Sequence, residues 1–143
     1  MNGPPAGPAL TTDCVVFDAD RGFLLIRRGY PPFQGAYALP GGFVETGESV
    51  EDACRRELEE ETGLAANALR LVGVYSEPGR DPRGPTVSIA YLAVVSGQSA
   101  AAGSDAAATE WIKDWRDLEL AFDHARILGD AEKVLARPDR SPA

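Results

Sequence analysis

The chain has 143 residues, of which 44% are hydrophobic and 25% are charged. This composition is typical of one soluble globular domain and excludes a disordered or fibrous protein. The 14 basic and 22 acidic residues give a net charge of −8, which would repel a nucleic-acid backbone. No apolar run approaches the ~18 residues of a membrane span, and no secretory signal is visible. We therefore expect a cytoplasmic protein that binds neither nucleic acid nor a membrane.

The N-terminal part of the sequence predicts a leader and three strands. Residues 1–10 are rich in proline, glycine and alanine, so we expect a flexible leader. Residues 11–17 and 23–28 are apolar, β-branched-rich runs on either side of a short turn, which predicts a hairpin. After a loop with paired prolines, residues 37–42 predict a short strand that runs into the turn Pro40-Gly41-Gly42.

The middle of the chain predicts one helix and two strands. The helix begins at Ser49, whose hydroxyl can cap it, and ends at Gly63, which supplies the left-handed C-terminal position. Residues 69–76 and 87–95 are apolar and predict strands. The segment between them, residues 77–85, is a charged and proline-rich loop.

The C-terminal part predicts a short strand at residues 109–112 and a last helix that is capped by Asp123 and stopped by Pro138. We expect one domain that covers residues 11–138, followed by a flexible tail at 139–143. The expected architecture is α/β (α+β mixed), with a mixed β-sheet between helices in an α/β/α sandwich.

The chain contains two cysteines, Cys14 and Cys54, and one histidine, His124. Two cysteines do not form a disulfide framework, and with one histidine they do not supply the four ligands of a structural zinc site. Each cysteine lies in an apolar segment, so we expect two buried thiols in a reducing compartment.

The predicted helix after Ser49 gathers acidic charge. At 100° per residue, Glu57, Glu60 and Glu61 share the arc that carries the apolar residues of this helix. Burying a carboxylate costs on the order of several kcal/mol unless another group compensates its charge. Two interpretations remain open: the helix end projects into solvent, or the clustered oxygens bind a divalent cation such as Mg²⁺ or Mn²⁺.

The residues around this helix form a recognisable motif. The pattern Gly42-x5-Glu48-x7-Arg56-Glu57-Leu58-x-Glu60-Glu61-x-Gly63-Leu64 matches the Nudix box at every defined position. The chain therefore resembles the Nudix hydrolase family, and most of all the bacterial and archaeal ADP-ribose pyrophosphatases. The resemblance implies a mixed sheet between helices and Mg²⁺-dependent cleavage, with Mn²⁺ as a substitute, of a nucleoside diphosphate linked to another moiety.

The resemblance also assigns roles within the box. It implies that the metal is held by Glu57, Glu60, Glu61 and the carbonyl of Gly41, with Arg56 orienting the glutamates. Gly42, Glu48 and Gly63 are then structural positions of the box, with Glu48 bridging to the metal cluster or to the helix. The general base varies in the family, so Glu57 is the first candidate and Asp105 and Glu110 are the alternatives.

The substrate is predicted from a loop. Residues 76–84 resemble the corresponding loop of ADP-ribose pyrophosphatases and offer Arg80 and Arg83 to a phosphate or ribose and Asp81 to ribose hydroxyls. A rigid proline-rich turn with solvated charges is the other interpretation of this loop. One of Arg27 and Arg28, at the end of the second predicted strand, is expected to face the substrate cleft.

Together these observations favour an enzyme that converts ADP-ribose to AMP and ribose 5-phosphate. NADH, a (deoxy)nucleoside triphosphate or a dinucleoside polyphosphate is the alternative substrate. A non-catalytic Nudix-fold module that binds a ligand or regulates is the alternative from another class. Many members of the family are dimers, so the resemblance also suggests a homodimer. Finally, the segment Phe122-Asp123-His124 resembles the start of the last helix in ADP-ribose-hydrolysing members.

Overall fold

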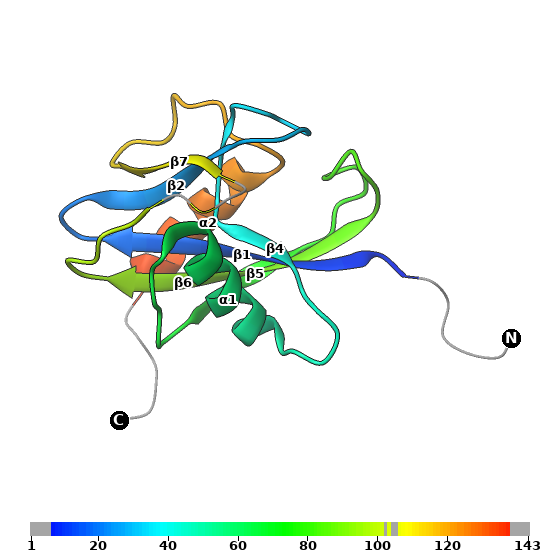
Figure 1. Ribbon diagram of the computed structural model, residues 1–143, viewed down its shortest axis with the longest axis horizontal. Coiled ribbons are helices and arrows are strands. Elements are labelled where there is room, and N and C mark those ends of the chain that lie inside the picture. The colour runs from blue at the N-terminus through cyan, green and yellow to red at the C-terminus, as the bar shows by residue number, and fades with distance from the viewer. Residues whose placement is uncertain (1–6, 102, 104–105, 138–143) are drawn as a thin grey trace, which may run out of the picture.

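The computed structural model describes residues 7–101, 103 and 106–137. In these ranges the chain forms one mixed β-sheet and two helices (Figure 1). Neither of these two helices is long and apolar enough to cross a membrane. The strands are β1 (Ala9–Asp18), β2 (Gly22–Arg28), β3 (Tyr37–Ala38), β4 (Gly41–Phe43), β5 (Arg70–Tyr75), β6 (Thr86–Val95) and β7 (Ala106–Ile112). The helices are α1 (Val50–Thr62) and α2 (His124–Leu135).

The sheet combines parallel and antiparallel pairing, as the sequence predicted. Its main path runs in the order β3-β2-β1-β6-β5, while β4 also pairs with β1 and β7 also pairs with β2. Strands β1 and β6 are parallel from the pair Ala9↔Thr86 to the pair Asp18↔Val95, and every other pair is antiparallel. Because β1 lies at the centre, it supports both the β4 edge and the long β6 strand.

The predicted hairpin is confirmed, but its first strand starts earlier than expected. Phe17 pairs with Phe23 across the turn. Strand β1 begins at Ala9, whose backbone N–H donates to the Pro85 carbonyl at 3.1 Å. Residues 9 and 10 therefore belong to the sheet and not to the predicted leader, because pairing with β6 satisfies their backbone groups. The rest of that leader up to residue 6, and the predicted tail, lie outside the described residues.

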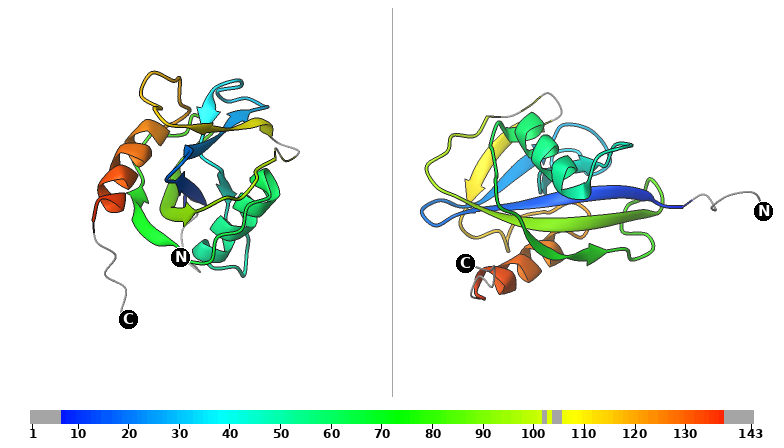
Figure 2. Two further views of the ribbon diagram at one scale, coloured as in Figure 1. Left: turned by 90° about the vertical axis from the view of Figure 1, so that its left-hand side faces the viewer. Right: turned by 90° about the horizontal axis from the view of Figure 1, so that it is seen from below.

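The two helices cover opposite faces of the sheet. Side chains alternate along β1, so Cys14 and Val16 pack under α1 with Cys54, whereas Val15 packs under α2 with Leu128. Both cysteines are free and buried, as predicted. The left-hand view of Figure 2 shows the sheet between α1, in green, and α2, in orange and red. This is the α/β/α sandwich that the sequence predicted.

The N-cap positions of both helices were predicted correctly, but only in α1 does the N-cap side chain make a capping hydrogen bond. The Ser49 hydroxyl accepts from the Asp52 N–H at 3.1 Å, and Gly63 ends α1 with a left-handed φ of 75°. Asp123 precedes α2, but its side chain makes no capping hydrogen bond. Its carboxylate instead accepts from the guanidinium of Arg80, 43 residues away in the sequence, and a charged donor is the stronger partner.

Candidate active site

A cleft lies where β4, the end of β2 and the acidic side of α1 meet. It consists of two adjoining cavities of about 70 and 450 Å³. Residues from four segments of the chain line both cavities. These residues are Ile26, Arg28, Gly41, Gly42, Phe43, Glu61 and Arg83. We call this space the cleft below.

Helix α1 presents the box glutamates to the cleft in three different ways. Glu61 is half-buried and its Oε2 accepts from the Gly41 N–H at 3.1 Å, which ties α1 to β4. Glu57 is also half-buried and lines the larger cavity. Glu60 is the most exposed of the three, with 58% of its side chain accessible. The two glutamates that face the cleft are therefore those that the helical wheel placed closest to the apolar side.

Arg56 holds the acidic residues together. Its Nη1 donates to Glu57 Oε1 at 2.9 Å and to Glu60 Oε2 at 3.2 Å. Its Nη2 donates to Glu48 Oε1 at 2.7 Å and to the carbonyl of Phe43 at 3.0 Å. Hydrogen bonding by Arg56 keeps the pKa of Glu48 below its usual value. Arg56 and Glu48 thus lie where the resemblance implied, and they join the loop before α1 to the glutamates.

The electrostatics of the cluster favour a cation. Burial raises the pKa of Glu57, and the negative charges of Glu60 and Glu45 raise it further, against the opposing effect of Arg56. One guanidinium therefore does not fully compensate the carboxylates around it. A cation placed among them would relieve the remaining repulsion.

The chemistry of these residues fits a hard divalent cation, since carboxylate and carbonyl oxygens are its preferred ligands. Gly42 leaves room for the carboxylate of Glu57, because a Cβ on Gly42 would lie 2.5 Å from the Glu57 carboxylate carbon. In the part of the chain that the structure describes, no three acidic, histidine or cysteine side chains yet converge on one point. Glu57 and Glu60 instead point to Arg56, and rotation of these flexible side chains would be needed to surround an ion.

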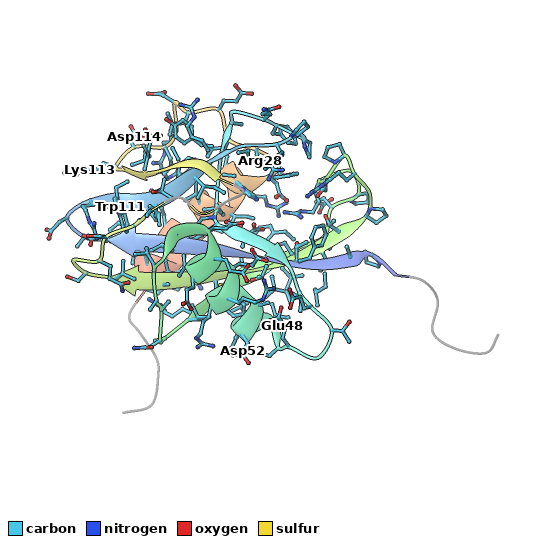
Figure 3. The ribbon with its side chains drawn as sticks, viewed as in Figure 1. Arg28, Glu48, Asp52, Trp111, Lys113 and Asp114 are labelled. Atoms are coloured by element: carbon cyan, nitrogen blue, oxygen red, sulfur yellow. The ribbon has the colours of Figure 1, made fainter. Side chains whose placement is uncertain are left out.

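Two arginines line the cleft together with the glutamates. The Arg28 guanidinium stacks 5.0 Å from the Phe122 ring centroid, and that of Arg83 lies 5.5 Å from the Phe43 centroid and 5.7 Å from that of Phe122. Burial lowers the pKa of Arg28, and the nearby positive charge of Arg83 lowers it further. Arg28, labelled in Figure 3, lines the same two cavities as Gly41, Gly42 and Phe43 of β4. Two like charges held side by side in a cavity are suited to an anionic ligand.

The structure brings only one of the two predicted strand-end arginines to the cleft. Arg28 lines it, whereas Arg27 points to the other face of β2, donates to the Gly35 carbonyl at 3.0 Å and stacks 4.7 Å from the Tyr37 ring. The register of β2 against β7 shifts between these two residues, and of the two only Arg28 lines the cavities. Arg27 is thus not a cleft residue.

The loop between β5 and β6 differs from its prediction in the role of Arg80. Only 5% of the Arg80 side chain is accessible, and its guanidinium is bound to both oxygens of Asp123 and to Thr86 Oγ1. Its donors are therefore occupied inside the protein and are not available to a phosphate or ribose. Arg80 anchors this loop to the start of α2.

Asp81 and Arg83 form a pair at the edge of the cleft. Asp81 is buried, and it accepts from the Arg83 backbone N–H at 2.9 Å and from Nη2 at 2.8 Å. The carboxylate that was expected to bind ribose hydroxyls therefore orients Arg83. Arg83 Nε also donates to Asp81, at 3.1 Å. The Arg83 side chain is 47% accessible and lines both cavities, so within this loop it is the candidate to contact a ligand.

Of the two alternative general bases, the structure describes only Glu110, which does not line the cleft. Asp105 lies outside the described residues. Glu110 is on β7, opposite Leu25 in the register, and therefore on the α2 side of the sheet. It is hydrogen-bonded to Tyr37, whose pKa this bond raises. Trp111, the next residue, packs on the α1 side under Arg21, away from Arg28 (Figure 3).

Several cleft residues were missed by the sequence analysis. Among them, Phe43 and Phe122 flank the arginines, Tyr30 lines the larger cavity, and Asp13 lines the smaller one. Asp13 carries a recognisable signal, because it is an acid that directly precedes the apolar run of residues 14–17. The aromatic residues lie in loops or at strand ends, where no periodicity marks them.

Comparison with known proteins agrees with this geometry. The profile of the NUDIX domain matches residues 7–137. An ADP-ribose pyrophosphatase of Methanocaldococcus jannaschii is 48% identical over 86% of this chain and 72% of that protein. A solved MutT/nudix family protein from Enterococcus faecalis has a TM-score of 0.88 and 32% identity, covering 99% of this chain and 68% of that one. The NUDIX domain of Shewanella oneidensis NrtR in complex with ADP ribose has a TM-score of 0.86 and 29% identity, covering 94% and 95% of the two chains. The chain belongs to the Nudix family.

Proposed function

We propose that the protein is a Mg²⁺-dependent hydrolase that cleaves the pyrophosphate of ADP-ribose to AMP and ribose 5-phosphate. The observation that carries this proposal is that two carboxylates of the box, Glu57 and Glu61, and two arginines, Arg28 and Arg83, line the same cavity. The similarity to an ADP-ribose pyrophosphatase and to a domain solved with ADP ribose supports this substrate. A pyrophosphate between two ribose units needs both a cation site and cationic donors.

Different residues would bind the cation, position its carboxylate ligands and accept a proton from the attacking water. Glu57, Glu60, Glu61 and the carbonyl of Gly41 would hold the cation, which when bound polarises phosphoryl oxygens and lowers the pKa of water. Arg56 keeps the carboxylates at one end of α1. Glu57, half-buried in the wall of the larger cavity, is the candidate to accept the proton of the attacking water.

The arginines bind and orient the substrate. Arg28 and Arg83 donate to the phosphate or terminal ribose, and the rings of Phe43 and Phe122 hold their guanidinium planes in place. Phosphoryl transfer requires mainly positioning and charge stabilisation, so these contacts act directly on the rate.

The non-catalytic module is not favoured as an alternative. Every defined position of the box is retained, and Glu57, Glu60 and Glu61 are all found at the acidic end of α1. A cytoplasmic location and a homodimer remain predictions from the sequence.

A substrate panel tests the proposed function. The protein is incubated with ADP-ribose, NADH, diadenosine polyphosphates and nucleoside triphosphates in Mg²⁺ or Mn²⁺, and the products are separated by chromatography. We expect ADP-ribose to have the highest kcat/KM and to yield AMP and ribose 5-phosphate. A higher kcat/KM for another compound would identify that compound, and not ADP-ribose, as the preferred substrate. The absence of turnover with every compound would favour a binding module.

Two arginines of one loop are expected to behave differently. Arg83→Ala should raise the KM for ADP-ribose by ~10-fold, because it removes a charge-assisted donor, and should also lower the free energy of unfolding, because it leaves the buried Asp81 carboxylate with fewer donors. Arg80→Ala should lower the free energy of unfolding by ~3 kcal/mol, because it leaves the Asp123 carboxylate without its partner. Steady-state kinetics and urea denaturation measure the two effects.

The pair is informative because both variants lose one arginine from the same segment. If Arg80→Ala raised KM while its stability stayed unchanged, Arg80 would have to leave its ion pair to meet substrate. If Arg83→Ala left kcat/KM unchanged, the loop would be a structural turn only.

A further inference from the structure

The start of α2 reaches three separate parts of the cleft. Phe122 has a left-handed φ of 53°, which is strained for a non-glycine residue, and its ring lies beneath Arg28 and Arg83. Asp123 binds Arg80. His124 lines the smaller cavity, yet only 5% of its side chain is accessible. The function proposed above gives no role to this histidine.

The hydrogen bonds of His124 fix its protonation pattern. The backbone N–H of Leu39 donates to His124 Nδ1 at 3.0 Å, so Nδ1 carries no proton. The other nitrogen, Nε2, lies 3.3 Å from Asp13 Oδ1 and directs its proton to that carboxylate. Both ring nitrogens are therefore used inside the protein, which leaves neither for a substrate atom.

The Asp13 carboxylate, which accepts from His124, also interacts with Ser88 and Arg80. The Ser88 hydroxyl donates to Asp13 Oδ2 at 2.6 Å, and Arg80 Nη2 lies 3.9 Å from the same oxygen. Asp13 is buried in β1, where it pairs with Gly41 of β4. His124 is thus connected through one residue to the central strand and through another to the turn that precedes β4.

The turn before β4 ends at Gly41, which contacts Glu61 of the Nudix box. The Cys14 N–H donates to the Pro40 carbonyl at 2.8 Å, and the Gly41 N–H donates to Glu61 Oε2 at 3.1 Å. Gly41 has no room to shift towards β1, because a Cβ there would lie 2.2 Å from the Thr12 carbonyl oxygen. The path from His124 to Glu61 therefore consists of short contacts through a tightly packed segment.

From this connection we infer that His124 is a positioning residue: it holds the Leu39–Gly41 turn so that Gly41 and Glu61 keep the arrangement that binds the cation. The inference rests on the proposed function for its effect on the rate, but its effect on cation binding is independent of the substrate. His124 does not act as an acid, a base or a substrate ligand.

The test compares His124→Ala, which removes both hydrogen bonds, with His124→Asn, whose amide oxygen can still accept from the Leu39 N–H. Val134→Ala, a buried change in the same helix away from the cleft, is the control for lost stability. Mn²⁺ binding is measured without substrate by the electron paramagnetic resonance signal of the free ion. Kinetics with ADP-ribose and thermal unfolding are measured on all variants.

We expect His124→Ala to weaken Mn²⁺ binding at least fivefold and to lower kcat at least 30-fold, with the KM for ADP-ribose within twofold of wild type. His124→Asn should recover at least half of the lost binding free energy for Mn²⁺. Val134→Ala should lower the melting temperature but bind Mn²⁺ and turn over like wild type. If His124→Ala fails to fold, the test rests on the other two variants. In that case His124→Asn should bind Mn²⁺ more weakly than Val134→Ala does.

Two results would overturn the inference. One is unchanged Mn²⁺ binding together with a raised KM, which would make His124 a substrate ligand. The other is a loss of Mn²⁺ binding in Val134→Ala equal to that in the histidine variants, which would make the effect one of stability. Failure of the proposed function looks different: wild type would not hydrolyse ADP-ribose, while the Mn²⁺ difference between the variants persisted.

Discussion

Glu60→Gln and Glu61→Gln are each expected to lower kcat for ADP-ribose by ~10²-fold or more at saturating Mg²⁺. Each change replaces a charged oxygen with a neutral amide in a group that is proposed to bind the cation. Folding should be retained, because removing a negative charge from a crowded acidic cluster relieves repulsion. The melting temperature without metal is therefore expected to stay the same or to rise. Activity assays and thermal unfolding on the same preparations measure both quantities.

Glu59→Gln is the matched control for these variants. It makes the same chemical change in the same helix, but Glu59 is exposed on the side of α1 away from the cleft. We expect it to keep wild-type kcat. Full turnover by Glu60→Gln or Glu61→Gln would remove that residue from the proposed cation site, and an equal loss in Glu59→Gln would point to a general effect of helix charge.

The two glycines of β4, Gly41 and Gly42, are expected to separate activity from stability. In Gly42→Ala the new Cβ would lie 2.5 Å from the carboxylate carbon of Glu57, which is the end of a flexible side chain. The clash is relieved when that carboxylate moves, so we expect kcat to fall at least tenfold with little change in stability. In Gly41→Ala the new Cβ would meet the Thr12 carbonyl oxygen at 2.2 Å and the Asp13 Cα at 3.0 Å.

The backbone of β1 cannot yield as a side chain does, so Gly41→Ala is expected to lower the free energy of unfolding by ~1–3 kcal/mol. Urea denaturation and kcat measured on both variants give the comparison. An equal stability loss in the two variants, or full activity in Gly42→Ala, would show that Glu57 does not need its observed place beside Gly42.

The sequence was most informative where the determinants are local. The caps at Ser49 and Gly63 depend only on the geometry of one helix, and the structure agrees with both. Of the three glutamates predicted to share the apolar arc, Glu57 and Glu61 are half-buried as expected, whereas Glu60 is exposed. The contact of Arg56 with Glu60 also follows from the i,i+4 spacing along α1, whereas its contact with the adjacent Glu57 does not. The acidic face of α1 was therefore predictable from the sequence, and its role in binding a cation stays a prediction.

The substrate half was harder because its residues are fixed by distant partners. Arg80 and Asp123 were each assigned a local role, as a ligand donor and as a helix cap, but they bind each other across 43 positions of sequence. Arg27 and Arg28 are adjacent at the end of β2, and only the packing of this strand decides which of them faces the cleft. No spacing in the sequence contains that information.

The long parallel pairing of β1 with β6 bears on the order in which the site forms. It joins residues that are more than 70 positions apart, as in the 77 that separate Thr12 from Ile89. Such a contact closes a large loop before it stabilises anything, which slows folding. Helix α1 needs no such closure, so we expect it to form early in folding and to pack against β1 late. Until β1 pairs with β6, the carboxylates of α1 would remain exposed to solvent.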